Sequence, residues 1–347
     1  MFSGVPPFGL LTALTLQNAL LVLLVRKSKM GEPYIASVAV VVAEVLKFFI
    51  CLASLFYSKG YSSTITAFNL RPWGVRARIA VPALIYGAQN NLLHLALSNL
   101  DVSTFQVLSQ LKILTTAVFF VVLLQRSITR EQWVHLVILI VGVMLITLSQ
   151  PEKAGPTGPT TSQGSTTLHG KERNVFVGLV AVLFLCCLSG FSGVYAEKML
   201  KGQVTLSVDE FNLELSLWSF FINCGLAWQL DGARIVESGA FQNFSGWTIG
   251  VIFVSGAGGV LTGYVMRYAD NVLKVYATAV SLLFSSFLSY CFLGDETVKS
   301  IMFLLGASNV LCSTLLYTGV LQSKSPLPQP GQNDVEQNNI KSSSELK

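Results

Sequence analysis

Long apolar runs recur along the whole chain, and their length is the feature that most constrains its fold. A run of roughly 17 to 25 apolar residues matches the length that a helix needs to cross a bilayer. Ten such segments are expected here, at residues 5–25, 34–58, 79–98, 102–124, 131–149, 175–196, 211–231, 247–266, 271–294 and 300–321. Charged residues make up only 12% of the chain, against about 25% in soluble domains. The sequence therefore predicts an all-α, polytopic membrane protein.

The polar segments divide the ten expected helices into two groups of five. Residues 150–174 are rich in Gly, Pro, Ser and Thr, which is typical of a flexible linker. The chain before it, 1–149, forms the first expected five-helix unit, and 175–322 forms the second. The remaining residues, 323–347, have almost no apolar content and are expected to be a disordered polar tail.

A shift of 169 residues reveals a weak internal repeat. It aligns Asp101 with Asp270, and each of these residues directly precedes an expected helix. The same shift aligns a stripe on one helical face (Phe105, Ser109, Lys112, Thr116) with Lys274, Thr278, Ser281 and Ser285. Because each half has an odd number of spans, the two halves are expected to be inverted repeats. Transporters of this architecture bind their substrate between the repeats, near the middle of the membrane.

Two lysines inside expected spans require a reason, because a charged residue at the centre of a membrane helix costs about 2.5–3.5 kcal/mol on insertion scales. Lys112 has no acidic residue three or four positions away. If Lys112 and Lys274 face one cavity, they favour an anion, above all a phosphate that supplies the missing charge. The alternative is that they pair with carboxylates such as Asp270 or Glu214.

Three consecutive amides, Gln89, Asn90 and Asn91, offer hydrogen-bond donors and acceptors together. Such groups can recognise the edge of a base or the hydroxyl groups of a sugar. They can equally well bond neighbouring helices, as polar residues do in membrane bundles. Tyr86 lies one turn before Asn90 and is expected on the same helical face.

A second charged pair and a group of glycines have similarly open roles. Glu44 and Lys47 are three residues apart, so that they can pair with each other. This pair either packs the bundle or contacts substrate. The glycines in "VSGAGGVLTGY", residues 254–264, allow close helix approach and more often mark packing than binding.

Catalytic and metal-dependent functions have little support in the sequence. It contains no His/Cys cluster, no G-x-S-x-G and no Walker loop. We therefore expect no enzyme activity, no metal and no cofactor. The net charge of +5 is spread along the chain and indicates no nucleic-acid partner.

Several of these motifs occur together and in one order in a known family. They are "QNALLVLLVR", "AEVLK", "VPALIYGAQNNL", "TFQVLSQLKILTTA", "SGFSGVYAEKMLK" and "YADNVLKVYATAVSLLFSS". Over roughly residues 5 to 320 the chain resembles the nucleotide-sugar transporters of the Golgi, in the branch that carries UDP-galactose, UDP-N-acetylglucosamine and CMP-sialic acid. The resemblance implies a ten-helix fold of the drug/metabolite-transporter type. It also implies alternating access, with cytosolic nucleotide sugar exchanged for luminal nucleoside monophosphate.

The resemblance also implies roles for individual residues. The family's two cavity lysines, near the nucleotide phosphate, match Lys112 and Lys274, and its three amides match Gln89–Asn91. Phe105 matches a family position that is commonly aromatic, and Ser109 lies in the same polar stripe.

The seventh expected span departs from the family pattern, in which "R-N-[IL]-Q" is common. Here the stretch is "FNLE": Asn212 matches, Phe211 replaces the arginine, and Glu214 replaces the glutamine. A tyrosine that CMP-sialic acid carriers show two residues later is Ser216. The departure argues against CMP-sialic acid, and Glu214 either alters sugar choice or pairs with a lysine.

The sequence thus predicts an antiporter of the Golgi membrane that exchanges a UDP-sugar for UMP, with UDP-galactose first and UDP-N-acetylglucosamine next. The alternatives are a CMP-sialic acid carrier and a non-transporting adaptor that recruits glycosyltransferases. Expected partners besides the two nucleotides are the lipid bilayer and, among proteins, a second copy of the chain or a Golgi glycosyltransferase.

Overall fold

The computed structural model describes residues 6–149, 174–202, 206–294 and 296–324. Within these ranges the chain forms α-helices and one short 3-10 helix, with no strand, so the predicted all-α class is confirmed. Almost all of the predicted linker and of the predicted tail lie outside the described residues.

The helices of the first half end at Ser149, and those of the second half begin at Val175. The first set is α1 (Pro7–Ser28), α2 (Ala36–Lys59), α3 (Tyr61–Asn69), α4 (Trp73–Asn99), α5 (Val102–Ser109), α6 (Leu111–Leu124) and α7 (Arg130–Ser149). The second set is α8 (Val175–Lys201), α9 (Val208–Ser238), α10 (Gly246–Tyr268), α11 (Asn271–Leu293), the 3-10 helix η1 (Glu296–Lys299) and α12 (Ile301–Lys324).

Seven helical segments among the described residues are long and apolar enough to cross a membrane. They are α1, α2, the run Thr104–Leu124 across α5 and α6, α7, α8, α10 and α11. The other three expected spans fall on α4, α9 and α12, which are helical but do not meet both criteria. A membrane protein with several spans is therefore supported, while the count of ten and the inverted repeat stay predictions.

Two local features differ from the sequence-based expectation. The short helix α3 was not expected, and it begins directly after Gly60, whose φ of +80° favours glycine. It ends shortly before Pro72, and this proline directly precedes the first turn of α4. The expected helix 102–124 is divided into α5 and α6, which meet at Gln110.

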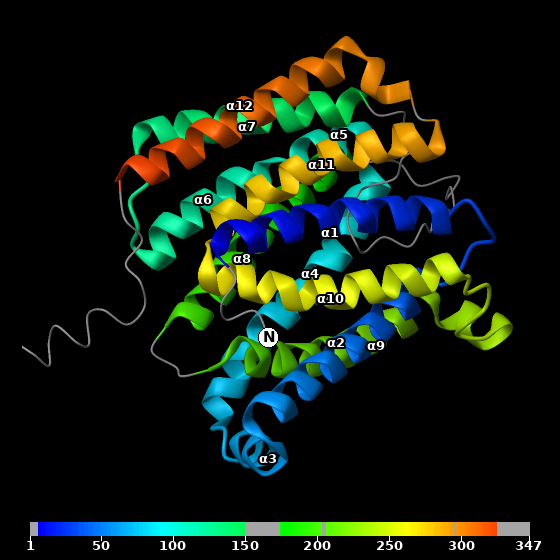
Figure 1. The fold of residues 1–347 in the computed structure, drawn as a ribbon. Helices are drawn as coiled ribbons and strands as arrows, with labels where there is room; N and C mark the ends of the chain where they lie inside the picture. Colours follow the sequence, from blue (N-terminus) through cyan, green and yellow to red (C-terminus); the bar gives the residue numbers. More distant parts are fainter. Residues whose placement is uncertain (1–5, 150–173, 203–205, 295, 325–347) are drawn as a thin grey trace, which may run out of the picture.

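The helices of the two halves interleave in space. Figure 1 shows α1 lying along α10 and α11, and α2 lying along α9. At the top of the view, α7 packs against α12. The helices α4 and α6 both pack against α8. Helices of the first half therefore find their main partners in the second half.

One buried apolar cluster fills the region where seven of these helices meet. It draws on α1 (Leu10, Leu14), α2 (Cys51, Leu55), α4 (Ile79), α8 (Ala196, Leu200), α9 (Phe211), α10 (Tyr264, Met266) and α11 (Ala277). These residues come from the first part of α1, the last part of α2 and the last part of α10. The cluster thus seals one end of the helix bundle and leaves the middle free for a cavity.

Candidate functional site

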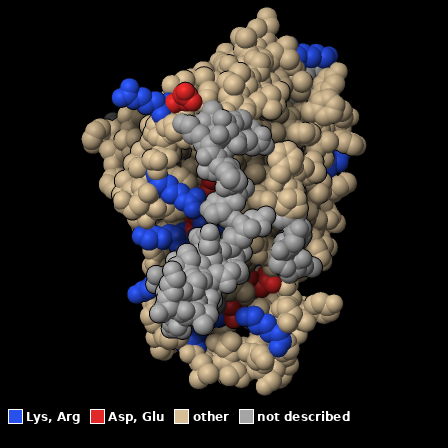
Figure 2. Space-filling model, turned by 60° about the vertical axis from the view of Figure 1, so that its left-hand side comes forward, with Lys and Arg blue, Asp and Glu red and all other residues tan. Residues whose placement is uncertain are grey.

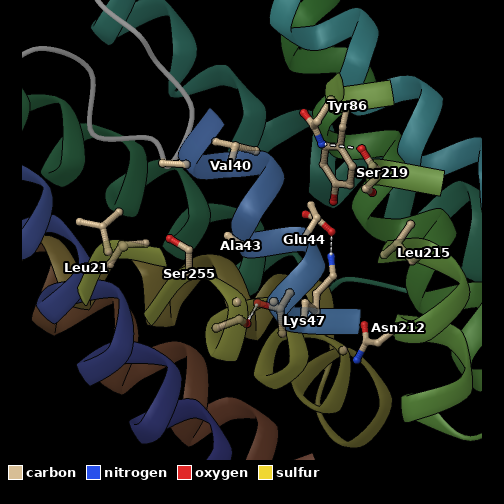
Figure 3. Close-up of a pocket in the computed structure, with 18 of the residues that line it drawn as sticks. Leu21, Val40, Ala43, Glu44, Lys47, Tyr86, Asn212, Leu215, Ser219 and Ser255 are labelled. Atoms are coloured by element: carbon tan, nitrogen blue, oxygen red, sulfur yellow. Dashed lines mark hydrogen bonds and ion pairs between the residues drawn. The ribbon is translucent and has the colours of Figure 1, made fainter. Parts of the chain in front are cut away.

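A cavity of about 470 Å³ lies between α1, α2, α4, α8, α9 and α10. This volume falls within the range of about 300–1,000 Å³ that is usual for small-molecule sites. Much of its wall is apolar, and polar side chains enter it from five helices (Figure 3). They are Gln17 and Asn18 of α1, Glu44 and Lys47 of α2, Tyr86 and Gln89 of α4, Asn212, Ser219 and Asn223 of α9, and Ser255 and Thr262 of α10.

Glu44 and Lys47 form an ion pair on the cavity wall. The Lys47 ammonium lies 2.5 Å from a carboxylate oxygen of Glu44, so the predicted pairing is confirmed. The Lys47 side chain is 8% exposed, and the Glu44 side chain is 20% exposed. Figure 3 shows the Tyr86 ring pointing toward the Glu44 carboxylate from the opposite wall. The pair therefore presents a carboxylate and an ammonium group inside the cavity.

The glycines of α10 make room for these polar side chains. A Cβ atom at Gly258 would lie 2.2 Å from the amide nitrogen of Gln17, and one at Gly259 would lie 2.8 Å from Cδ of Lys47. The sequence suggested close helix packing for these glycines. The structure shows a more specific reason, because the missing side chains leave space for cavity-lining residues of α1 and α2.

Of the predicted residues on α4, Tyr86 and Gln89 line the cavity. The side-chain amide of Gln89 donates a hydrogen bond to the Ser192 hydroxyl at 3.5 Å, which links α4 to α8. Asn91 is exposed, is not part of this wall, and donates to the Gly87 carbonyl of its own helix at 3.4 Å. The side chain of Asn90 lies outside what the structure describes.

Of the three predicted residues on α9, Asn212 lines the cavity. Its side-chain amide donates to the Val260 carbonyl of α10 at 3.4 Å. Glu214 and Ser216 are fully buried and are not part of the wall. The Ser216 hydroxyl donates to the Leu213 carbonyl at 2.8 Å. Glu214 accepts from Arg71 at 3.0 Å, so it pairs with an arginine rather than with a lysine.

Lys112 and Lys274 are not among the residues that line this cavity. Lys112 is exposed on α6, and Lys274 is partly buried on α11. The charges of Glu197 and Lys112 both act electrostatically on Lys274. Within the described residues neither lysine has a carboxylate within 4 Å. Asp270, a candidate partner, instead accepts from the Leu273 backbone N–H at the start of α11.

The remaining two predicted residues lie on α5. The Phe105 ring is buried against α8, in an apolar cluster that includes Ala181 and Val182. The Ser109 hydroxyl donates to the Gln106 carbonyl at 2.8 Å. Neither residue is part of the wall of the cavity.

Comparison with known proteins gives a single family. The model of the nucleotide-sugar transporter family matches residues 8–318, which is most of the chain. The chain belongs to the nucleotide-sugar transporter family. Because this is a family of transporters, the match fits the expectation that the chain is not an enzyme.

Similar members of the family are named for different UDP-sugars. The chain is 37% identical to the "UDP-N-acetylglucosamine/UDP-N-acetylgalactosamine transporter nstp-4" of Caenorhabditis elegans, over 88% of this chain and 91% of that protein. It is 39% identical to the "UDP-galactose translocator" of Bos taurus, over 89% and 76%. It is 38% identical to the "UDP-N-acetylglucosamine transporter" of Bos taurus, over 88% and 92%.

A solved crystal structure supports the fold of this family member independently. The two chains share 12% sequence identity and align over 89% of this chain and 97% of the other, with a TM-score of 0.60. At this level of identity the likeness concerns the fold alone.

Sequence reasoning missed several residues that line the cavity of this transporter. Gln17 and Asn18 lie in the first expected span, and Ser219 and Asn223 lie in the seventh. Isolated amides inside apolar runs are the signal that could have identified them. Their neighbours in space, by contrast, come from distant helices and cannot be inferred from local spacing.

Proposed function

We propose that this protein exchanges a UDP-sugar for UMP across the Golgi membrane by alternating access. UDP-galactose is the first candidate cargo, and UDP-N-acetylglucosamine is the next. The observation that carries the proposal is a family match over nearly the whole chain, combined with relatives at 37–39% identity named for these two sugars.

The charges of the site support an anionic cargo. Glu44 and Lys47 neutralise each other on the cavity wall, so that this pair alone does not compensate a diphosphate. Lys112 and Lys274, which are not part of the cavity wall, add two positive charges, and within the described chain neither forms an ion pair. In our proposal these two ammonium groups bind the phosphates. As flexible point charges, they hold a phosphate without the rigid clamp of an arginine, which suits a cargo that must also be released.

The polar groups on the cavity wall support recognition of the uncharged parts of the cargo. The amides of Gln89 and Asn212 offer donors and acceptors for a base or sugar. The Glu44–Lys47 pair adds a carboxylate acceptor and an ammonium donor at the same wall. A UDP-sugar has matching groups on both its uracil and its hexose.

Counterflow into UMP-preloaded proteoliposomes tests the proposal. The purified protein is offered a panel of UDP-, CMP- and GDP-sugars, and the proposal expects UMP-dependent uptake of UDP-galactose or UDP-N-acetylglucosamine. Uptake of CMP-sialic acid alone would assign a different cargo. Absence of exchange for the whole panel, from a protein that is folded and membrane-inserted, would favour the non-transporting adaptor.

A further inference from the structure

Five charged side chains form a closing cluster at one end of the cavity: Lys59, Arg71, Arg76, Glu210 and Glu214. Arg71 lies 3.0 Å from Glu214 and 3.4 Å from Glu210. Arg76 lies 3.7 Å from Glu214, and Lys59 lies 3.2 Å from Glu210. The closing cluster thus joins the end of α2 and the start of α4 to the first turns of α9.

The position of the cluster relative to the cavity follows from the two faces of α9. Phe211, Asn212 and Leu215 line the cavity, whereas Glu210 and Glu214, one turn apart, point toward α4. Figure 2, which turns the left side of Figure 1 toward the viewer, shows basic side chains beside acidic ones at this end of the molecule.

Residues at four-residue intervals on α2 connect the cavity with the closing cluster. Lys47 lines the cavity, Cys51 and Leu55 are buried in the apolar core, and Lys59 belongs to the cluster. Cys51 has no exposed surface. This face of α2 therefore passes from the cavity, through a sealed apolar layer, to the ion pairs.

A second set of bonds reinforces the same layer. The Asp209 carboxylate accepts hydrogen bonds from Ser54 of α2 at 2.6 Å and from Tyr264 of α10 at 2.8 Å. Arg76 lies over the Phe68 ring at 4.5 Å and donates to the Phe68 carbonyl, which connects α3 to the cluster. These contacts thus involve α2, α3, α4, α9 and α10 at this end.

The opposite end of the cavity differs from the end at the closing cluster in its exposure to solvent. Lys29, at the connection between α1 and α2, both lines the cavity and is exposed. Near the closing cluster the lining residues Phe211 and Met266 are instead buried. The cavity is therefore open toward the α1–α2 connection and closed toward the end of α2.

We propose that the closing cluster is the gate of this end, and that Arg71 and Arg76 must part from Glu214 for the cavity to open there. The inference rests on the proposed function, because a carrier with alternating access must open this end at another stage of its cycle. Glu214 is 1% exposed, and one of its carboxylate oxygens has no hydrogen-bond partner in the described structure.

Because Glu214 is buried, the gate has two states, one with the ion pairs intact and one with the ion pairs broken. If the arginines withdrew while Glu214 stayed buried, the carboxylate would be an uncompensated charge, which is strongly unfavourable. The ion pairs are therefore either intact in a dry end or broken in a hydrated one. Water that reaches Glu214 also reaches the neighbouring apolar layer and Cys51.

Labelling of Cys51 tests the gate. In a variant that keeps Cys51 as its only cysteine, reconstituted in liposomes, the rate of reaction with N-ethylmaleimide reports opening of the sealed layer. We expect Glu214→Gln and Arg71→Gln each to raise the rate on the order of tenfold, equivalent to about 1.4 kcal/mol. The double variant should react no faster than the faster single one, because residues in one ion pair are not additive. It also leaves no carboxylate of the cluster unpaired, because Glu210 keeps its ion pair with Lys59, so that it remains testable if a single variant does not fold.

Asp231→Asn is the matched control. Asp231 is a buried carboxylate on the same helix, α9, and it accepts a hydrogen bond from Ser37 of α2 at 2.5 Å, at the opposite end of the cavity. Its loss should leave the Cys51 rate unchanged. An unchanged rate in the cluster variants, or an equal increase in Asp231→Asn, would overturn the gate. Labelling requires no transport, so that failure of counterflow alone would refute the proposed function and not the closure.

Discussion

Removal of either partner of the Glu44–Lys47 ion pair should destabilise the protein measurably, although the pair lies inside a cavity. Removing one partner of a buried pair leaves an uncompensated charge and costs about 3–5 kcal/mol. Lys47 is 8% exposed at its side chain, while Glu44 is 20% exposed and can gain some hydration from the cavity. We therefore expect Glu44→Gln to lower the free energy of unfolding by about 3 kcal/mol, at the lower end of that range.

A double-mutant cycle separates the pair from the size of the side chains. Lys47→Met should destabilise by a similar amount, because it leaves Glu44 unpaired. The double variant removes both charges and should lie within about 1 kcal/mol of the unsubstituted protein. Reversible denaturation of the purified protein in mixed micelles measures all four free energies.

The cycle also distinguishes stability from function. If the pair contacts the cargo, the double variant is stable but has a raised KM for UMP exchange. Losses below about 1 kcal/mol in both single variants, with an additive double variant, would refute the view that the pair is desolvated. A stable double variant with normal exchange would reduce the pair to a packing role.

Three further substitutions test the two lysines and the cavity wall. Lys112→Ala and Lys274→Ala should each abolish UMP exchange in proteoliposomes while the protein stays folded and inserted, and near-normal exchange in either variant would contradict its phosphate role. Gly263→Ala would place a Cβ atom 2.5 Å from the amide nitrogen of Asn212 and displace this side chain. We expect its affinity for UMP, measured by calorimetry, to fall roughly tenfold, equal to one lost hydrogen bond. Gly225→Ala, which meets no atom within 4 Å, is the control, and equal losses in the two variants would contradict the steric argument.

Helix positions were predictable from the sequence because the bilayer imposes one length on each apolar run. The expected start of the second span, residue 34, lies two residues before the start of α2. The prediction was poorer where helices continue beyond the apolar run. The seventh span was expected to end at residue 231, whereas α9 continues to Ser238 past the polar residues Asp231 and Arg234. Hydropathy predicts which residues of a helix lie inside the membrane, and it does not predict where the helix ends.

The site was predictable only where a polar residue was conspicuous in its own span. Gln89 and Asn212 stand out in apolar surroundings, and both line the cavity. The partner of Glu214 could not be predicted, because Arg71 lies 143 residues away in the chain. In the sequence Arg71 has the appearance of an ordinary charge in a loop between two spans. Only the packing of α4 against α9 brings it to a buried carboxylate.

The arrangement on α9 suggests how binding and gating are linked. Asn212 contributes to the cavity, and Glu214, two residues later, belongs to the closing cluster on another face of the same helix. Because an α-helix moves as a stiff body over two residues, a cargo that pulls on Asn212 also shifts Glu214 relative to Arg71. The cost of opening is then offset by contacts that only the correct cargo makes. In the proposed exchange cycle, a carrier built in this way would open its second end more readily with cargo bound than when empty.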